Sequence, residues 1–340
     1  MRMAVRLKTI ALASLAGLVL VAGACSGCRD DGEQTSDVGD TGDVAGDAEP
    51  ETDGSNTSPP GAEPTYTEER TPCSGRNPYR NAYFGDLHVH TELSFDAFAF
   101  EVRNSPADAY RFARGEALAI PPLDADGEGT RTVQLDRPLD FLAVTDHSEY
   151  IGEIELCQDP DSEAYDSSHC QQIRTGGADA VTDFGFRFAT DNPDRFSDIC
   201  GEDGLRCVDR AGTTWERIIQ AANEAYDRSE TCEFTSLVGY EYTRSQSANA
   251  LHRNVIFRND DVPETPISAY EESTALGLWR ALEQTCLQSD GDCDVLAIPH
   301  NANQSSGMMF MTEYPDAEGT AEQREQAAFR SRIEPLFEIY

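Results

Sequence analysis

The sequence predicts an α/β fold, and two features of its pattern support that prediction. Short apolar runs of strand length alternate with stretches of helical length, which is the order expected of strand–helix units around a largely parallel sheet. Three of the apolar runs end in histidine, at His88, His147 and His300. Because barrel proteins place their functional residues after the C-terminal ends of successive strands, this pattern predicts a site at one end of a barrel-like sheet.

Residues 1–24 have the pattern of a secretory signal peptide. Basic residues precede an apolar run over residues 10–21, which is too short and too weakly flanked for a stable membrane-spanning helix. Small residues then lead to Cys25, and a cysteine in that setting resembles a bacterial lipoprotein processing site. We therefore expect an exported protein that is lipidated at Cys25 and anchored to a bacterial membrane, in the periplasm or at the cell surface. An ordinary signal peptide, or processing at Cys28, is the alternative.

Residues 25–70 are expected to form a disordered acidic tether. They consist mainly of Asp, Glu, Gly, Thr, Ser and Pro, and they contain too few large apolar side chains to offset the entropy of ordering the chain. The whole chain carries a formal charge of −36, from 62 acidic and 26 basic residues. Because such a charge repels nucleic acid, we expect no nucleic-acid partner, and bound cations would have to attract any anionic substrate.

Residues 71–340 are long enough for one α/β domain, and their eight cysteines favour export, because disulfides persist in oxidising compartments. Three pairs are close in sequence, and the remaining two cysteines would form a long-range bridge. The expected pairs are Cys157 with Cys170, Cys200 with Cys207, Cys286 with Cys293, and Cys73 with Cys232. This pairing is one of many that eight cysteines allow, and none of the spacings is that of a zinc ribbon.

The first half of the domain is expected to begin with a strand over residues 81–89. Residues 106–115 predict a helix, because proline stands in its first turn and glycine at its end. Residues 139–145 are a continuous apolar run, typical of a strand buried on both faces of a parallel sheet. Residues 153–210 are polar, contain cysteines and lack clear periodicity, so we expect an irregular insertion over the barrel mouth.

The second half continues the alternation of helices and strands. Apolar side chains recur at helical spacing over residues 214–229, and residues 271–287 and 323–332 are further expected helices. Short apolar runs between these helices predict strands at residues 235–242, 254–258 and 295–298, and another strand is expected to begin at residues 335–340.

Five of the six histidines lie in short motifs beside apolar runs. His88 and His90 are two residues apart at the end of the first expected strand, so their side chains share a face and can bind one ion. Asp96 follows closely as a candidate oxygen ligand, and the alternative role for its carboxylate is to cap a helix or turn. His169 lies in the expected insertion, where we predict a structural role for it.

The later strands supply the other candidate ligands. His147 and His300 follow apolar runs, and His252 precedes one, so each lies at the edge of an expected strand. Asp146, next to His147, is expected to orient a histidine ligand from behind, as carboxylates near metal sites commonly do. The mixture of imidazole and carboxylate groups suits two or three divalent Zn, Mn or Fe ions.

Glu241 differs from the other candidates because it lies inside an apolar strand. A lone carboxylate is costly to bury, so this side chain requires a partner. Two cations that the carboxylate bridges would satisfy it, and Arg253 is the alternative partner. We assign Asp146 and Glu241 as the candidate catalytic residues.

These motifs resemble those of the polymerase-and-histidinol-phosphatase superfamily. The matching strings are Asp86-Leu-His-Val-His-Thr91, Thr145-Asp-His147, a Gly-x-Glu strand ending at Glu241, and Pro299-His300. A closer resemblance, from about Cys73 to Tyr340, is to an uncharacterised branch called domain of unknown function 3604. The strings that add to it include Ser94-Phe-Asp-Ala97, His252-Arg-Asn-Val-Ile-Phe257 and Ile298-Pro-His-Asn301.

The resemblance implies a distorted TIM-like (β/α)7 barrel with a site of two or three metals that hydrolyses phosphate esters. It assigns His88 and His90 to one metal, Glu241 as a bridge to a second metal completed by His252 and His300, and His147 with Asp96 to a third. The superfamily closes its site with a late Asp-x-His element, and no histidine follows His300 in this chain. We therefore expect an incomplete barrel and a chain that is a fragment.

Three classes of function fit these observations. The leading one, which follows from the histidine and carboxylate motifs and the resemblance, is a metal-dependent hydrolase that attacks small phosphate esters with metal-activated water. A serine hydrolase is a poor fit, because the Gly-x-Ser-x-Gly motif of many such enzymes does not occur. The second is a surface lipoprotein that binds a metal or ligand without turnover. The third is a metal-dependent hydrolase of another bond, such as an amide or a sulfate ester. No oligomeric state is predicted.

Overall fold

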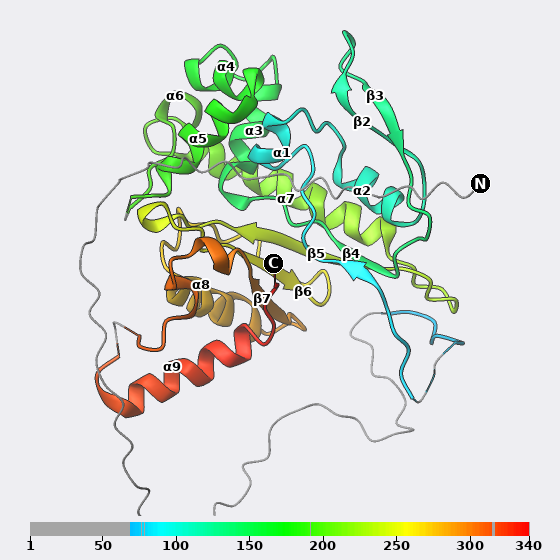
Figure 1. The fold of residues 1–340 in the computed structure, drawn as a ribbon, viewed down its shortest axis with the longest axis vertical. Helices are drawn as coiled ribbons and strands as arrows, with labels where there is room; N and C mark the ends of the chain where they lie inside the picture. The colour runs from blue at the N-terminus through cyan, green and yellow to red at the C-terminus, as the bar shows by residue number, and fades with distance from the viewer. Residues whose placement is uncertain (1–68, 76, 78, 191, 315–316, 340) are drawn as a thin grey trace, which may run out of the picture. The chain divides into compact units, whose positions relative to one another are not determined.

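The computed structural model describes residues 69–75, 77, 79–190, 192–314 and 317–339 (Figure 1). The expected signal peptide, Cys25 and the expected tether lie outside these described residues, except for the last two tether residues, Glu69 and Arg70. Among the described helices, none is long and apolar enough to span a membrane.

A five-stranded sheet forms the centre of the domain and confirms the expected mixture of helix and strand. Its strands are β1 (Gly85–Asp86), β4 (Phe141–Ala143), β5 (Thr235–Tyr242), β6 (Arg253–Phe257) and β7 (Val295–Pro299), and they adjoin one another in that order. The sheet curls into a half-barrel. Within the described residues it does not close into the expected seven-stranded barrel, because β1 and β7 each have one neighbour.

The expectation of a parallel sheet is wrong for β6. β1, β4 and β5 are parallel neighbours, whereas β6 is antiparallel to both β5 and β7. Residues 243–252 connect β5 to β6 without room for the crossover helix that a parallel neighbour requires. As a result, the first residue of β6 lies beside the last residues of β5 and β7.

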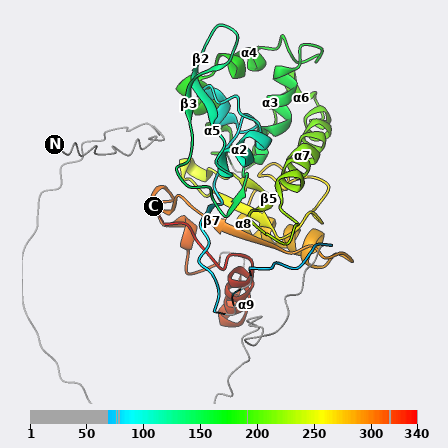
Figure 2. The same cartoon turned by 90° about the vertical axis from the view of Figure 1, so that its right-hand side faces the viewer.

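Helices flank the sheet, with α1 to α7 above it and α8 and α9 below it in Figure 1, and Figure 2 shows the same division from the side. The helices are α1 (Phe95–Ala99), α2 (Pro106–Ala113), α3 (Ile151–Gln158), α4 (Ser168–Thr175), α5 (Gly177–Arg187), α6 (Ser197–Cys200), α7 (Leu205–Ala225), α8 (Ala275–Leu282) and α9 (Gly319–Ile333). Short helical turns are η1 (Ser148–Tyr150), η2 (Gln246–Ala248), η3 (Glu283–Leu287), η4 (Ala302–Gln304) and η5 (Met308–Phe310).

The long helix α7 covers the centre of the sheet. Its fully buried Trp215 packs edge-on against Tyr240 of β5, with ring centroids 5.7 Å apart, and the indole N–H donates to the carbonyl oxygen of Pro263. Burying an aromatic side chain with its polar atom bonded combines a large apolar contact with a satisfied donor. This packing holds β5 firmly, and β5 carries Glu241.

The segment expected to be an irregular insertion is largely helical. It contains most of α3, all of α4, α5 and α6, and the start of α7. Gly152 lets α3 approach α7 closely, because a Cβ atom there would lie 2.2 Å from the carbonyl oxygen of Cys207. Isolated helices this short are marginal in water, so packing and disulfides must stabilise them. Because they are too short to show a sustained apolar periodicity, a search for that pattern in the sequence does not find them.

Several element boundaries differ from the expected ones. The first strand is shorter than residues 81–89, and α7 begins before residue 214 because its first turns pack under α6 and α3. A hairpin of β2 (Leu118–Leu123) and β3 (Gly129–Val133) was not expected. Residues 334–339 form no strand, so the strand expected from residue 335 is wrong, although the backbone N–H of Glu338 donates to the carbonyl oxygen of Pro299 at 3.0 Å.

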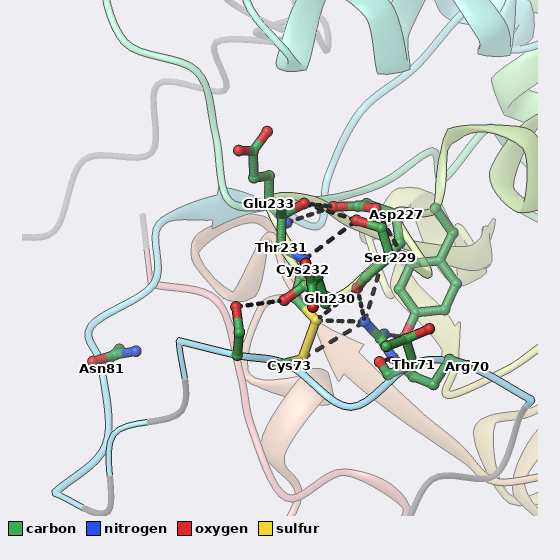
Figure 3. The surroundings of a disulfide bond; sticks show 12 residues. Arg70, Thr71, Cys73, Asn81, Asp227, Ser229, Glu230, Thr231, Cys232 and Glu233 are labelled. Carbon is green, nitrogen blue, oxygen red and sulfur yellow. Dashed lines mark hydrogen bonds between the residues drawn. A yellow bond between two sulfur atoms is a disulfide. The ribbon is translucent and has the colours of Figure 1, made fainter.

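All four expected disulfides are present. They are Cys73–Cys232, Cys157–Cys170, Cys200–Cys207 and Cys286–Cys293. The Cys73–Cys232 bridge joins the beginning of the described chain to the loop between α7 and β5 (Figure 3). The guanidinium group of Arg70 lies against this bridge, 2.6 Å from Sγ of Cys232, and donates to the carbonyl oxygens of Asp227 and Ser229.

We predict that the Cys73–Cys232 disulfide is reduced before the Cys200–Cys207 disulfide in the native protein. Cys73 and Cys232 are partly exposed, whereas Cys200 and Cys207 are fully buried. The protein must therefore open locally before a thiol can attack the Cys200–Cys207 bridge. An opening cost of about 1.4 kcal/mol already slows reduction about tenfold.

Limited reduction with dithiothreitol, followed by alkylation and peptide mass mapping, measures the order. Faster loss of the Cys200–Cys207 bridge, or a free thiol among the eight cysteines before reduction, would contradict the prediction.

Candidate metal centre

The candidate ligands lie on one face of the sheet. Side chains two or four residues apart on a strand share a face. A small cluster of apolar side chains on β4, β5, β6 and β7 lies on the same face as the candidate ligands. In each strand, one cluster residue is two or four positions from a ligand: Ala143 from His147, Leu237 from Glu241, Ile256 from His252, and Ile298 from His300. The alternation of side chains along each strand therefore places these candidate ligands on the same face of the sheet.

The register of the sheet brings these strand ends together. Glu241 on β5 lies opposite Asn254 on β6, which lies opposite Ile298 on β7. His147 forms a parallel bridge with Glu241, and the backbone N–H of His300 donates to the carbonyl oxygen of His252 at 3.2 Å. Four segments that are far apart in sequence thus meet at one end of the sheet.

Five imidazole rings surround the carboxylate of Glu241. Oε2 faces two of them, with His90 Nε2 at 2.8 Å and His88 Nε2 at 3.4 Å. Oε1 faces the other three, with His252 Nδ1 at 2.7 Å, His300 Nε2 at 3.0 Å and His147 Nδ1 at 3.5 Å. The five histidines singled out in the sequence are therefore all brought together, and Glu241 lies at their centre.

Glu241 is 1% exposed, and its charge is maintained by its neighbours. Burial opposes ionisation, but attraction to His147 and His300 and the hydrogen bonds from the surrounding rings hold the pKa of Glu241 well below its ordinary value. Burial lowers the pKa of His147 and His300, which favours the neutral imidazole that binds metals. Against the effect of burial, the neighbouring carboxylates raise the pKa of His88 and of His90, which favours their protonated form. Arg253, the alternative partner, pairs instead with Glu334.

Asp96, the candidate oxygen ligand, lies beside two of the histidines. Its Oδ2 lies 3.0 Å from Nδ1 of His90 and 3.7 Å from Nε2 of His147. Burial opposes ionisation of Asp96, yet these two rings hold its pKa well below the usual range. Its Oδ1 also accepts from the hydroxyl of Ser94 and the backbone N–H of Ala97, so the carboxylate supports the first turn of α1 as well.

Asp146 lies behind the histidines instead of among them. Its carboxylate accepts hydrogen bonds from the backbone N–H and the hydroxyl of Thr91, the residue after the His88-x-His90 pair. Burial raises the pKa of Asp146 to about 6, although both bonds from Thr91 favour its ionised form. The contacts place it as a support for the loop that carries the two histidines, while its assignment as a catalytic residue stays a prediction.

Glu338 is a carboxylate of the cluster that the sequence analysis missed. Its Oε2 lies 3.0 Å from Nδ1 of His88, and together with His300 these side chains form a group close enough to share an ion. A signal was present, because Glu338 lies between large apolar residues in the string Leu336-Phe-Glu-Ile339, as Glu241 does in its strand. Because Glu338 is 250 residues away from His88 in the sequence, the string around it does not indicate that the two side chains meet.

A second buried carboxylate, that of Glu149, lies close enough to Glu241 to feel its charge. Glu149 is fully buried, and its Oε1 accepts from the backbone N–H groups of Thr243 and Ala269. Burial raises the pKa of Glu149 to about 8, with a further contribution from the charge of Glu241. Both effects favour the protonated form of Glu149, so they reduce the negative charge beside the cluster.

Two other groups in the described chain do not join the site. His169 lies on α4, 34% exposed, with its Nδ1 2.7 Å from Asp198, so it remains apart from the other histidines as expected. Cys200 and Cys207 lie beside Glu153, but their sulfurs are joined in a disulfide and offer no thiolate to a metal.

The clustered side chains form groups that could hold metal ions. Overlapping groups of imidazole and carboxylate atoms lie within 4.8 Å of one another: His88, His90 and Glu241; His90, Asp96 and His147; and His147, Glu241 and His252. Nδ1 of His300 is buried and has no hydrogen-bond partner among the described residues. A buried nitrogen with an unused lone pair, in a set of mixed nitrogen and oxygen donors, suits Zn, Mn or Fe.

A curled mixed sheet with histidines and carboxylates at its strand ends defines the class: an α/β protein with a candidate multinuclear metal centre. The chain belongs to the DUF3604 family, described as a protein of unknown function, whose model matches residues 77–340. No curated protein and no solved structure matches the chain.

We predict that Zn²⁺ or Mn²⁺ stabilises the protein and that His300→Ala weakens this effect. A ligand that binds only the folded state at 100 times its Kd adds about 2.7 kcal/mol of stability. For a domain of this size that corresponds to a rise in Tm of roughly 5–10 °C.

The measurement is thermal unfolding of chelator-treated protein with and without added metal, and His169→Ala is the matched control outside the cluster. An equal shift in the His300→Ala and His169→Ala variants would show that the metal binds elsewhere.

Proposed function

We propose that the protein is a metal-dependent hydrolase of small phosphate esters with two or three divalent Zn, Mn or Fe ions. The observation that carries the proposal is the convergence of five imidazoles and the buried Glu241 carboxylate at one end of the curled sheet. This arrangement, with the family membership, supports a relation to the polymerase-and-histidinol-phosphatase superfamily and its distorted (β/α)7 barrel.

To bind an anionic phosphate ester, this strongly acidic protein needs positive charge at the site. The chain has a formal charge of −36, so an anionic ester would be repelled from most of its surface. Bound divalent cations supply the Lewis acidity that activates water and neutralises charge on a phosphoryl group. His88, His90, His147, His252 and His300 would hold them, with Asp96 and Glu241 as the oxygen ligands.

The residues of this chain prepare the site before substrate arrives. Glu241 keeps its negative charge under burial and aligns five rings toward one point. Thr91 and Asp146 support the loop that carries His88 and His90, and Asp96 orients His90 through Nδ1. Such preorganisation reduces the reorganisation needed when charge develops in the reaction.

We predict that metal-loaded protein hydrolyses phosphate monoesters or diesters and that Glu241→Gln and His88→Ala each reduce kcat/KM at least about 100-fold. The physical reason is the loss of ligands that place the cations. p-Nitrophenyl phosphate and bis(p-nitrophenyl) phosphate are suitable first substrates, and His169→Ala should retain wild-type turnover.

Bound metal with no hydrolysis across phosphate esters would instead support a metal-binding protein without turnover. Turnover of an amide or sulfate ester, with phosphate esters untouched, would redirect the proposal to another bond. Unchanged kcat/KM in both ligand variants would rule out this site.

We also propose that the protein is exported and anchored to a bacterial membrane through lipidated Cys25. Four disulfides support an oxidising compartment, and the string before Cys25 supports lipoprotein processing. We predict that Cys25→Ser abolishes incorporation of labelled palmitate and moves the protein from the membrane to the soluble fraction, whereas Cys28→Ser changes neither. Labelling that persists in the Cys25→Ser variant would contradict the assignment.

A further inference from the structure

The segment that follows α9 is anchored to the sheet by a buried acid. Glu334 is 1% exposed, and its Oε1 pairs with Nε of Arg253 and accepts from Nε1 of Trp279 at 2.9 Å. Its Oε2 accepts from Nε of Arg330 at 2.9 Å. Because a buried carboxylate with three charged or polar partners resists displacement, the start of the segment has a defined position.

The same segment is held a second time close to the metal centre. The backbone N–H of Glu338 donates to the carbonyl oxygen of Pro299, the residue before His300. The side chain of Glu338 then turns toward the first histidine of the cluster, with Oε2 3.0 Å from Nδ1 of His88. Anchors at Glu334 and at the backbone of Glu338 thus fix the position of this carboxylate.

The ring of His88 has a carboxylate at each nitrogen. Nε2 faces Glu241 and the centre of the cluster at 3.4 Å, and Nδ1 faces Glu338. His90 has the same arrangement, with Nε2 toward Glu241 and Nδ1 toward Asp96. An imidazole binds a metal through one nitrogen, and a carboxylate that accepts from the other N–H fixes the tautomer and the ring orientation.

We propose that Glu338 is a positioning residue, which accepts a hydrogen bond from Nδ1–H of His88 and so presents Nε2 to the metal centre. This inference rests on the proposed function, since it assumes that His88 binds a metal. It gives the segment after α9 a role in the site. The same segment is tied through Glu334 to Arg253 on β6, the residue next to His252.

The test is metal affinity, measured by Zn²⁺ competition with a chromophoric chelator on the full chain. Glu338→Ala should weaken the affinity of one Zn²⁺ by about 10–100-fold without changing the number of ions bound. Glu338→Gln should recover part of this loss, because the amide oxygen still accepts from Nδ1–H. Glu325→Gln, an exposed acid on α9, is the matched control and should bind as the wild type does.

A second measurement reports which nitrogen of the His88 ring carries the proton. In ¹⁵N spectra of histidine-labelled protein, the His88 ring should show a protonated Nδ1 in the wild type and lose that preference in Glu338→Ala. Its signals are assigned by their absence in His88→Ala. This readout does not depend on turnover.

Two results would overturn the proposal. Loss of one bound Zn²⁺ in both Glu338 variants would make the carboxylate a direct ligand, and wild-type affinity with an unchanged His88 tautomer in Glu338→Ala would leave it no role. Failure of the proposed function looks different: wild-type protein would bind Zn²⁺ and hydrolyse no ester, while the effects of the Glu338 variants on affinity and tautomer would persist.

Discussion

The carboxylate of Glu241 places a negative charge inside the protein, and the rest of the site is arranged around it. Removing such a group from water is costly unless several polar partners replace the solvent. Here the partners are five imidazoles, which approach both carboxylate oxygens from the loop after β1 and from the ends of β4, β6 and β7. The same arrangement that satisfies the charge creates a dense set of nitrogen and oxygen donors, which is the basis of the proposed metal chemistry.

The sheet makes this convergence possible through the reversed direction of β6. Because β6 runs against β5 and β7, its first residues lie beside the last residues of its neighbours. His252 therefore faces the cluster, while the next residue, Arg253, points to the opposite face and pairs with Glu334. Two consecutive residues thus couple the metal centre on one face to the anchor of the segment after α9 on the other.

Disulfides and close helix packing stabilise the parts that the sheet does not hold. Most helices between β4 and β5 are short, and two bridges join consecutive ones: Cys157–Cys170 links α3 to α4, and Cys200–Cys207 links α6 to α7. Cys73–Cys232 connects the beginning of the described chain to the loop before β5. These bonds restrict the unfolded chain, and such disulfides are common in exported proteins.

Local pattern was enough to place most strands and the helices α2 and α9, and residue type with flanking sequence singled out the five histidines and Glu241. Three of the four disulfides join cysteines that are close in sequence, whereas the pairing of Cys73 with Cys232 followed only from the two cysteines left over. Local pattern failed for the helices of residues 153–210 and for the β2–β3 hairpin, where packing outweighs periodicity. The direction of β6, the half-barrel curl, the pairing of Arg253 with Glu334 and the approach of Glu338 to His88 required the folded chain. Each of these joins segments that are not neighbours in sequence, and the energy of such contacts depends on burial and register, which no short string of residues encodes.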